Sequence, residues 1–340
     1  MKQTIEEKIY HLLLGIAYGD ALGMPTENLN RQDIKQTFGV VAHLVSSSKN
    51  KKMNRKLSAG KVTDDTENSV FICQMLIKTK GKVDKNLFVK YLIRWIKTDP
   101  NSSSVIGPST KKAILAIERR VGINQAGITG TTNGAAMKIA PIGLVSSYQN
   151  IPQLVKNVAE ICIPTHNTKI AIQGASIIAV LVSYIFSHKK VNWKKLYKII
   201  YKTALDASKY GNPLPTPNIV KRIKYGKYIA KNFPEKKFLD ELYSFLGTGM
   251  QTIQTVPAAV SLVYRYQNNL RKITQVCANL GGDTDTIGAI CGAISGINGF
   301  NLTQKEISLL KKQNSINFRK LALELAPIVK EKRDASHADK

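Results

Sequence analysis

The chain is poor in acidic residues. Of its 340 residues, 23 are Asp or Glu and 50 are Lys or Arg, which gives a formal net charge of +27 at pH 7. The imbalance is strongest in residues 189–237, where Asp206 and Glu235 are the acidic residues. Such a field attracts polyanions. No zinc finger, RRM signature or recognition-helix pattern accompanies it, so we interpret the lysines as a solvated basic face and consider nucleic acid an unlikely partner.

Cysteine is scarce, and its placement indicates no cross-links. The four cysteines lie far apart in apolar surroundings and form no CxxC pair: Cys73, Cys162, Cys277 and Cys291. Neither a zinc knuckle nor a disulfide framework is therefore indicated. A reducing cytosol fits this pattern best, so we expect a cytoplasmic protein.

Long hydrophobic runs are also rare. Residues 170–186 form the one candidate membrane span, but this stretch is slightly short, carries Gln173 in its middle and is rich in small residues. We interpret it as a buried central helix and expect no membrane partner. At the N-terminus, Glu6 and Glu7 precede a short apolar segment that Asp20 interrupts, which predicts a first helix rather than a signal peptide.

Strand patterns are scarce, whereas helical spacing recurs along the chain. Apolar residues return every three or four positions, for example at Ile9, Leu12, Leu13 and Ile16. No linker rich in Pro, Gly or Ser divides the chain, and no repeat of solenoid length is present. The sequence predicts an all-α protein with a single domain over residues 1–330, followed by a disordered basic tail at 331–340.

Two stripes of glycine stand out against the helical pattern. Gly15, Gly19 and Gly23 are spaced by four residues, as are Gly288, Gly292 and Gly296. Each set lines one face of a helix and lets another backbone approach closely. Glycine inside a helix costs about 1 kcal/mol relative to alanine. We therefore predict that both helices lie deep in the fold and touch close neighbours.

Two acidic clusters stand out in this acid-poor chain. One is TDDTE at residues 63–67, and the other is GGDTDT at residues 281–286. Both lie where a loop enters a helix, so one interpretation is N-capping. Capping needs one such residue rather than four. Neighbouring carboxylates repel each other unless a cation lies between them, and Asp with Thr supplies the oxygen ligands that Mg²⁺ and Mn²⁺ prefer. The pattern favours a site for two divalent cations.

Two further segments allow either a functional or a structural interpretation. In GTTNGAAMKIAPIGL, residues 130–144, Gly130 and Gly134 free the backbone and Asn133 can donate and accept hydrogen bonds. Such a loop can hold phosphate, or it can be an ordinary turn before a buried helix. In PTHNT, a lone histidine, His166, precedes the central apolar helix. A lone histidine is more often structural than catalytic.

Taken in order, these motifs resemble the ADP-ribosylglycohydrolase family. The matching segments are GIAYGDALGMPTE, VTDDT, IGPST, TNGAAMKIAPIGL, THNTKIAIQGA, TVPAA and LGGDTDTIGAI. The resemblance runs from about residue 8 to residue 302. It implies an all-α orthogonal helical bundle in which two divalent cations, Mg²⁺ or Mn²⁺, support hydrolysis of the glycosidic bond at ribose C1. The expected substrate is ADP-ribose linked to a protein side chain or a polymer.

The resemblance also assigns site residues. The positions that match metal ligands are Thr63, Asp64, Asp65, Asp283, Asp285 and Thr286. The positions that match the substrate cleft are Glu27, Gly130, Thr131, Asn133, Gly134 and His166. For catalysis we expect Asp283 to handle the proton, Glu27 to position water or substrate, and Asp65 to support them.

Two departures and two alternatives remain open at this stage. Lys138 stands where the family often has arginine, which keeps the charge but loses the bidentate fork. Thr255 stands where a serine or an acidic neighbour is often found. The chain could instead hydrolyse a small N-riboside or nucleotide-like metabolite, or it could be an inactive family member that acts as an ADP-ribose-binding or structural protein. The sequence does not distinguish the linkage cleaved, the metal used or the oligomeric state.

Overall fold

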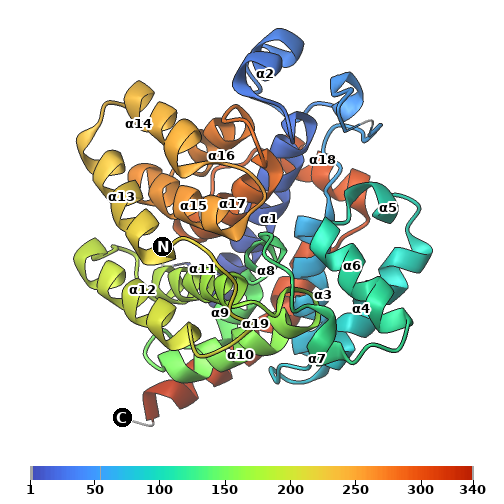
Figure 1. Cartoon of the computed structure of the whole chain (residues 1–340), viewed down its shortest axis with the longest axis vertical. Helices are drawn as coiled ribbons and strands as arrows, with labels where there is room; N and C mark the ends of the chain where they lie inside the picture. The colour runs from blue at the N-terminus through green and yellow to red at the C-terminus, as the bar shows by residue number, and fades with distance from the viewer. Residues whose placement is uncertain (1–2, 54, 339–340) are drawn as a thin grey trace.

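The computed structural model describes residues 3–53 and 55–338 and is built from helices joined mainly by short loops (Figure 1). Within these ranges there is no β-strand, and two isolated bridges join Thr132 to Gln251 and Thr168 to Asn212. The all-α prediction is therefore confirmed. The α-helices, in chain order, are α1 (Ile5–Gly23), α2 (Arg31–Phe38), α3 (Asp64–Lys78), α4 (Lys85–Thr98), α5 (Ser102–Val105), α6 (Pro108–Glu118), α7 (Ile123–Ala126), α8 (Gly134–Met137), α9 (Ala140–Val145), α10 (Ile151–His166), α11 (Lys169–Ser187), α12 (Trp193–Ala207), α13 (Ile219–Asn232), α14 (Glu235–Glu241), α15 (Thr252–Tyr266), α16 (Leu270–Ala278), α17 (Thr284–Gly299), α18 (Gln304–Asn314) and α19 (Phe318–Ala338). Short 3₁₀ turns η1 (Met24–Thr26) and η2 (Ser47–Lys49) and a π-helical turn η3 (Leu242–Leu246) complete the set.

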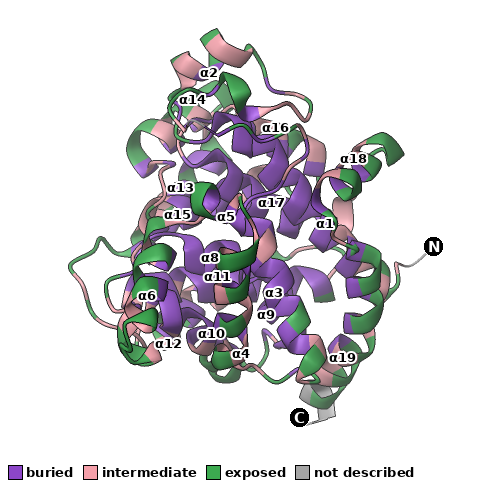
Figure 2. Ribbon diagram, turned by 90° about the vertical axis from the view of Figure 1, so that its right-hand side faces the viewer, coloured by how far each residue is buried: buried purple, intermediate pink, exposed green. Residues whose placement is uncertain are grey.

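The centre of the fold consists of helices that are buried along most of their length. Helices α1, α11, α15 and α17 lie inside, while α2, α4, α6 and α18 present exposed residues outward (Figure 2). Their buried side chains form one continuous apolar cluster. Helix α11 is long and apolar enough to cross a membrane by length and composition, yet 89% of its apolar window is buried among the other helices. It is the buried central helix that the sequence predicts.

Helices α1 and α17 meet along their glycine stripes. A Cβ atom at Gly19 would lie 2.0 Å from the carbonyl oxygen of Gly288, and one at Gly15 would lie 2.2 Å from that of Gly292. Both distances are shorter than any real contact, so the two backbones touch. The prediction of close neighbours is confirmed, and the neighbour of each stripe is the other stripe. We call this contact the glycine seam.

The C-terminal segment differs from its prediction. Instead of fraying after Lys330, helix α19 continues to Ala338. Val329 is fully buried, and the Arg333 guanidinium donates to the carbonyl oxygen of Leu144 and lies over the ring of Phe186. These contacts offset the entropy cost of ordering the segment. Composition alone predicts disorder because it does not reveal them. The last two positions of the predicted tail lie outside the described residues.

The glycine seam sets the geometry of the polar site. It holds the end of α1, and the turn η1 that follows, against the first residue of α17. Thr26 Oγ1 lies 3.1 Å from Thr284 Oγ1, and both hydroxyls donate to the carbonyl oxygen of Gly23. Helix α3 also packs against α1 and α17. Three segments that are remote in sequence therefore converge near the N-termini of α3 and α17.

Candidate functional site

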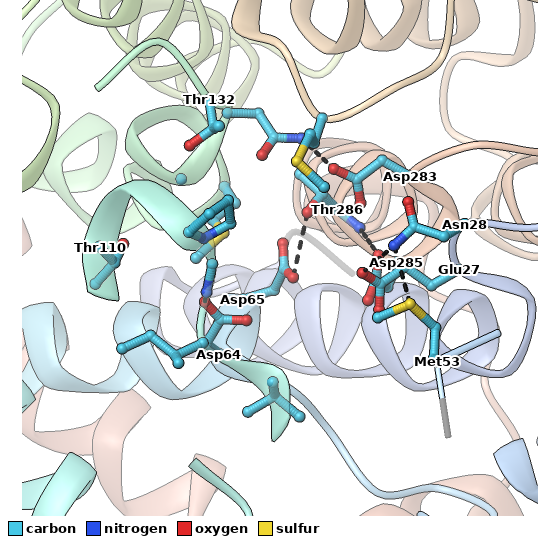
Figure 3. A pocket seen from close by; sticks show the side chains of 18 of the residues that line it. Glu27, Asn28, Met53, Asp64, Asp65, Thr110, Thr132, Asp283, Asp285 and Thr286 are labelled. Carbon is cyan, nitrogen blue, oxygen red and sulfur yellow. Dashed lines mark hydrogen bonds between the residues drawn. The ribbon is translucent and has the colours of Figure 1, made fainter. Parts of the chain in front are cut away.

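A cavity of about 190 Å³ opens at this junction (Figure 3). Its walls come from η1, α3, α17 and the segments around α5, α6 and α8. The lining residues that matter to its chemistry are Glu27, Arg55, Asp64, Asp65, Thr110, Thr132, Asn133, Gly134, Asp283, Asp285 and Thr286. All the polar side chains in this set are buried, and half of them are carboxylates. The cavity is therefore a carboxylate-rich pocket in a chain that has few carboxylates.

The first acidic cluster is held by helix capping. Thr63 is the N-cap of α3, and its Oγ1 accepts from the backbone N–H of Asp65 at 3.4 Å. Asp64 Oδ2 accepts from the backbone N–H of Gly107 at 3.1 Å. Thr63 thus does what the capping interpretation expects. It contacts Asp20 and Asp65 and does not itself line the cavity, whereas Asp64 and Asp65 do.

Asp20, which the sequence analysis did not assign to the site, anchors this cluster from α1. Its fully buried carboxylate accepts hydrogen bonds from four donor groups, at 2.6 to 3.2 Å. These donors are the backbone N–H and the hydroxyl of both Thr63 and Thr66. Burial raises the pKa of Asp20 to about 6, although these hydrogen bonds oppose the shift. The signal that could have revealed it is a carboxylate inside an apolar, glycine-lined helix.

The second acidic cluster depends on two glycines with left-handed backbones. Gly281 has φ of +82° and Gly282 has φ of +85°, a region that glycine adopts without strain. The turn is pinned on both sides, since Gly282 N donates to Leu29 O and Asp283 N donates to Thr248 O. Asp283 occupies the N-cap position of α17 but makes no capping hydrogen bond. Its carboxylate is turned into the cavity instead.

A direct contact joins the two clusters. Thr286 Oγ1 on α17 donates to Asp65 Oδ2 on α3 at 3.3 Å, across 221 positions of sequence (Figure 3). Carboxylate oxygens of Asp20, Asp65 and Asp285 lie within 4.8 Å of one another, as do those of Glu27, Asp283 and Asp285. Two overlapping sets that share Asp285 thus form one continuous acidic site.

The electrostatics of these groups fit a cation. Burial, followed by repulsion from Asp285, raises the pKa of Asp65 and of Asp283 well above the usual range of aspartate. Burial raises the pKa of Asp64 to about 7. Asp65 Oδ1 is buried and has no hydrogen-bond partner among the residues that the structure describes. An orphaned buried carboxylate oxygen among other carboxylates is poorly solvated, and hard divalent cations bind such all-oxygen sets.

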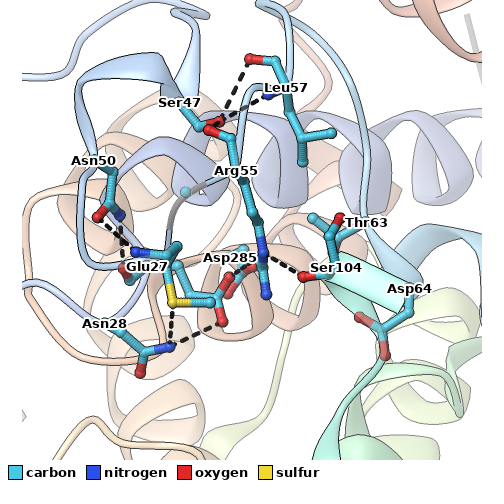
Figure 4. A network of polar contacts seen from close by, with 12 residues as sticks. Glu27, Asn28, Ser47, Asn50, Arg55, Leu57, Thr63, Asp64, Ser104 and Asp285 are labelled. Atoms are coloured by element: carbon cyan, nitrogen blue, oxygen red, sulfur yellow. Dashed lines mark hydrogen bonds and ion pairs between the residues drawn. The ribbon is translucent and has the colours of Figure 1, made fainter. Parts of the chain in front are cut away.

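Arg55 is the second residue that the sequence did not reveal. Its buried guanidinium pairs with Glu27 and donates to the carbonyl oxygen of Ser104 (Figure 4). Asn50 holds Glu27 from the other side by donating to its backbone oxygen at 2.9 Å. Burial raises the pKa of Glu27 to about 7, although Arg55 opposes the shift. Arg55 comes from a loop without helical periodicity, so no sequence pattern pointed to it.

The loop at residues 130–134 contributes unevenly to the cavity. Asn133 Nδ2 donates to Asp283 Oδ2 at 2.6 Å and to Thr255 Oγ1 at 2.8 Å, which gives Thr255 a supporting place behind the site. Gly134 lines the cavity, as does Thr132. Thr131 instead bonds to Gln251 Oε1 at 2.9 Å.

Two other predicted substrate positions lie behind the cavity wall. A Cβ at Gly130 would lie 2.4 Å from Thr165 O, so this glycine packs against the end of α10. His166 is fully buried and reaches the cavity edge through Thr132, whose hydroxyl lies 2.9 Å from His166 Nε2. Among the described residues, Gly130, Thr131 and His166 are not part of the lining.

Comparison with known proteins gives a consistent result. The family model described as ADP-ribosylglycohydrolase matches residues 1–305. The chain is 31% identical over 326 residues to "Uncharacterized protein YegU" of Escherichia coli (strain K12), covering 94% of this chain and 96% of that protein. It is 28% identical over 263 residues to "ADP-ribosylhydrolase ARH3" of Gallus gallus, covering 69% of each. A solved structure titled "ADP-ribosylglycohydrolase-related protein complex" matches with a TM-score of 0.68 and 22% identity, covering 96% of this chain and 99% of that one, which shows the likeness of fold.

Proposed function

Because this chain belongs to the ADP-ribosylglycohydrolase family, we propose that it is a metal-dependent hydrolase that cleaves the glycosidic bond at ribose C1 of ADP-ribosyl conjugates and releases ADP-ribose. One observation carries the proposal. Two acidic clusters more than two hundred residues apart meet around one cavity and are linked by Thr286 and Asp65. A structural descendant of the family would be free to lose such a set, which argues against an inactive binding protein.

The residues present fit a pair of divalent cations. We assign as ligands the residues that line the cavity with oxygen atoms at the two cluster sites, Asp64, Asp65, Asp283, Asp285 and Thr286, with Thr63 as a further candidate that also orients Asp65. When bound, Mg²⁺ or Mn²⁺ would supply positive charge that holds ribose hydroxyls and lowers the pKa of water. Mg²⁺ is our first choice. The unpartnered Asp65 Oδ1 supports this assignment.

The remaining chemical roles, proton transfer and the positioning of water or ribose, fall to the side chains of the protein. Breaking a glycosidic bond passes through an oxocarbenium-like state that needs a proton for the leaving group and water for the ring. Asp283 is placed for proton transfer, because its carboxylate faces the cavity and Asn133 holds its Oδ2. Glu27 faces the same cavity and positions water or ribose, while Asp65 supports both as a charged neighbour.

The size of the cavity bears on how the substrate binds. At about 190 Å³ it is smaller than the roughly 300 to 1,000 Å³ typical of ligand sites. We propose that the distal ribose enters the cavity and the diphosphate lies at its rim. Asn133 and Gly134 would contact the ribose, and Thr131 would approach the diphosphate, while Gly130 packs this loop against the end of α10. His166, which does not line the cavity, would act on the substrate site through its contact with Thr132.

The test is a panel of substrates. Purified protein would be incubated with ADP-ribosylated arginine, ADP-ribosylated serine, poly(ADP-ribose) and free nucleosides, each with Mg²⁺, with Mn²⁺ and with EDTA. We expect release of ADP-ribose from at least one conjugate with metal and its loss with EDTA. Cleavage of nucleosides alone would replace the proposal with a small-riboside hydrolase. No cleavage combined with no Mg²⁺ or Mn²⁺ binding in calorimetry would leave the inactive binding protein. Cytoplasmic localisation stays a prediction.

A further inference from the structure

Lys138 carries a buried amino group that the proposed mechanism does not use. It follows α8 and its side chain is 1% exposed. Its Nζ donates to Thr165 Oγ1 at 3.2 Å and lies 5.1 Å from the centre of the Phe88 ring. Burial lowers the pKa of Lys138 to about 8, so it is mostly protonated at pH 7. An ammonium group can donate hydrogen bonds but cannot accept them.

Because Lys138 can act only as a donor, it also constrains the hydrogen bonds of Thr165. A threonine hydroxyl has one hydrogen to donate. Because Lys138 must be the donor in its contact with Thr165 Oγ1, that oxygen accepts there and keeps its own hydrogen for another partner. Among the described residues, His166 Nδ1 is the other polar atom within hydrogen-bonding distance of the buried Thr165 Oγ1, at 2.8 Å, so the hydroxyl donates there and its hydrogen is not left buried without an acceptor. His166 Nδ1 is then an acceptor without a proton.

The tautomer of His166 follows from this step. A neutral imidazole with an unprotonated Nδ1 carries its proton on Nε2. His166 stays neutral because burial, aided by the charge of Lys138, lowers its pKa well below the usual range. Nε2 lies 2.9 Å from Thr132 Oγ1, which therefore accepts and passes its own hydrogen to Ser109 Oγ at 2.9 Å.

We propose that Lys138 and Thr165 are positioning residues that fix His166 in its Nε2–H tautomer and thereby orient the hydroxyl of Thr132 at the edge of the active-site cavity. The chain of donors runs from Lys138 through Thr165, His166 and Thr132. The inference deepens the proposed function, on which its kinetic part rests.

The packing around His166 makes its orientation matter. A Cβ at Gly134 would lie 2.7 Å from His166 Cε1, so the ring is in close contact with the loop that lines the cavity. Asn133, between Thr132 and Gly134, donates to Asp283. A ring that flips or rotates would displace this loop. Lys138 thus acts on the site through His166 without touching the substrate.

The tautomer can be read directly by NMR. In protein labelled with ¹⁵N-histidine, long-range ¹H–¹⁵N correlation spectra distinguish the two neutral tautomers and the imidazolium form. The chain has five histidines, and a His166→Gln spectrum assigns the signal. At pH 7 we expect His166 to be the Nε2–H tautomer. An Nδ1–H tautomer or an imidazolium in the unmodified protein would overturn the proposal without any variant.

Variants then test the origin of the tautomer. Lys138→Met should give His166 a measurable Nδ1–H population, because removing the ammonium charge beside Thr165 Oγ1 lowers the electrostatic cost of an Nδ1–H that points toward that oxygen, and Lys138→Arg should restore Nε2–H. If Lys138→Met does not fold, Thr165→Val serves, with Thr203→Val as the matched control because the Thr203 hydroxyl bonds within its own helix. An unchanged His166 signal in a folded Lys138→Met or Thr165→Val protein would contradict the proposal.

Kinetics give a separate readout. For the conjugate that the protein cleaves, Lys138→Met should raise KM by about tenfold with a smaller change in kcat, and Lys138→Arg should reverse most of it. A larger effect on kcat than on KM would contradict a positioning role. If no conjugate is cleaved, the proposed function fails, but the NMR result still decides the tautomer.

Discussion

At the residue scale, Asp283 has two proposed roles, proton transfer and metal binding, so its replacement is followed by two measurements. We predict that Asp283→Asn lowers turnover by about 100-fold or more, because an amide cannot transfer the proton that the leaving group needs. The measurement is single-turnover release of ADP-ribose, with Mn²⁺ binding followed by calorimetry. Asp33→Asn is a suitable control, since Asp33 is a surface partner of Lys52. A variant that bound both cations and kept wild-type turnover would rule out the assignment.

For Asp20 we predict a different effect, because this residue supports the site without lining the cavity. Asp20→Asn replaces a carboxylate that accepts from two backbone amides and two hydroxyls by an amide with one acceptor oxygen. Leaving buried donors unsatisfied costs about 1 to 3 kcal/mol. We expect a loss of this size in urea unfolding together with weaker Mn²⁺ binding. Wild-type metal affinity in the variant would show that Asp20 does not orient the cluster.

The residues of the site were predictable to different degrees. Asp64, Asp65, Asp283 and Asp285 stood out because clustered carboxylates are conspicuous in an acid-poor chain, and the structure brings all four to one cavity. Arg55 lies in a loop whose position depends on tertiary contacts, so no local pattern pointed to it. For Gly130, Thr131 and His166 the sequence located the right loop and helix end. It could not say which side of the cavity wall each would occupy, because that depends on packing.

At the scale of the element, the glycine seam predicts strong intolerance to side chains. Gly19→Leu would drive its Cβ into Gly288 O, a backbone atom that cannot move aside. We expect destabilisation of about 3 kcal/mol or more, at the upper end of overpacking effects, in a denaturant melt. Gly122→Ala is the matched control, since a Cβ there meets no atom within 4 Å. Equal stability of the two variants would refute close backbone packing at the seam.

The sequence predicts which segments form helices more securely than it predicts which helices contact each other. Apolar periodicity predicted α1, the apolar run at residues 170–186 predicted α11 as a buried helix, and the glycine stripes predicted that α1 and α17 lie deep with close neighbours. Periodicity carries no information about which partner a face meets, so the sequence did not predict that the two stripes contact each other. The extent of α19 was missed for a related reason. Its end is held by tertiary contacts of Arg333 that composition does not reveal.

At the scale of the whole molecule, the acidic site makes stability depend on pH when cations are removed. The pKa of Glu27 rises from 4.5 to about 7 on folding, and that of Asp64 from 3.8 to about 7, chiefly through burial. The folded protein therefore binds more protons than the unfolded chain, and its stability falls as pH rises from about 4 through 7. One pKa unit corresponds to about 1.4 kcal/mol, so Glu27 alone accounts for about 3 kcal/mol.

Urea unfolding in EDTA between pH 5 and pH 8 checks the predicted decrease of stability with pH. We expect the free energy of unfolding to decrease with pH in EDTA and to change much less with excess Mg²⁺, which supplies the missing positive charge. An Asp64→Asn protein should show a shallower slope in EDTA. A flat profile for the chelated wild-type protein would contradict the proposed burial of these groups.

The net charge of +27 supports a prediction about encounter with substrate. Exposed lysines line α12 and α13, which lie together at the left of Figure 1. If the field steers anionic conjugates, kcat/KM for poly(ADP-ribose) should fall as NaCl rises and the screening length shortens. Replacing Lys194, Lys198 and Lys202 by glutamate should reduce both the low-salt rate and its salt dependence. Efficiency that does not change with salt would refute steering.

The glycine seam also constrains how the protein can be made. Gly15 leaves the ribosome long before Gly292, its contact across the seam. At about 5 to 20 residues per second, the intervening chain takes roughly 15 to 50 s to synthesise. Throughout that interval the seam face of α1 has no partner, and the pocket lacks the aspartates of α17. The nascent chain therefore has neither its central helix pair nor its complete acidic pocket, and both form only after translation is nearly complete.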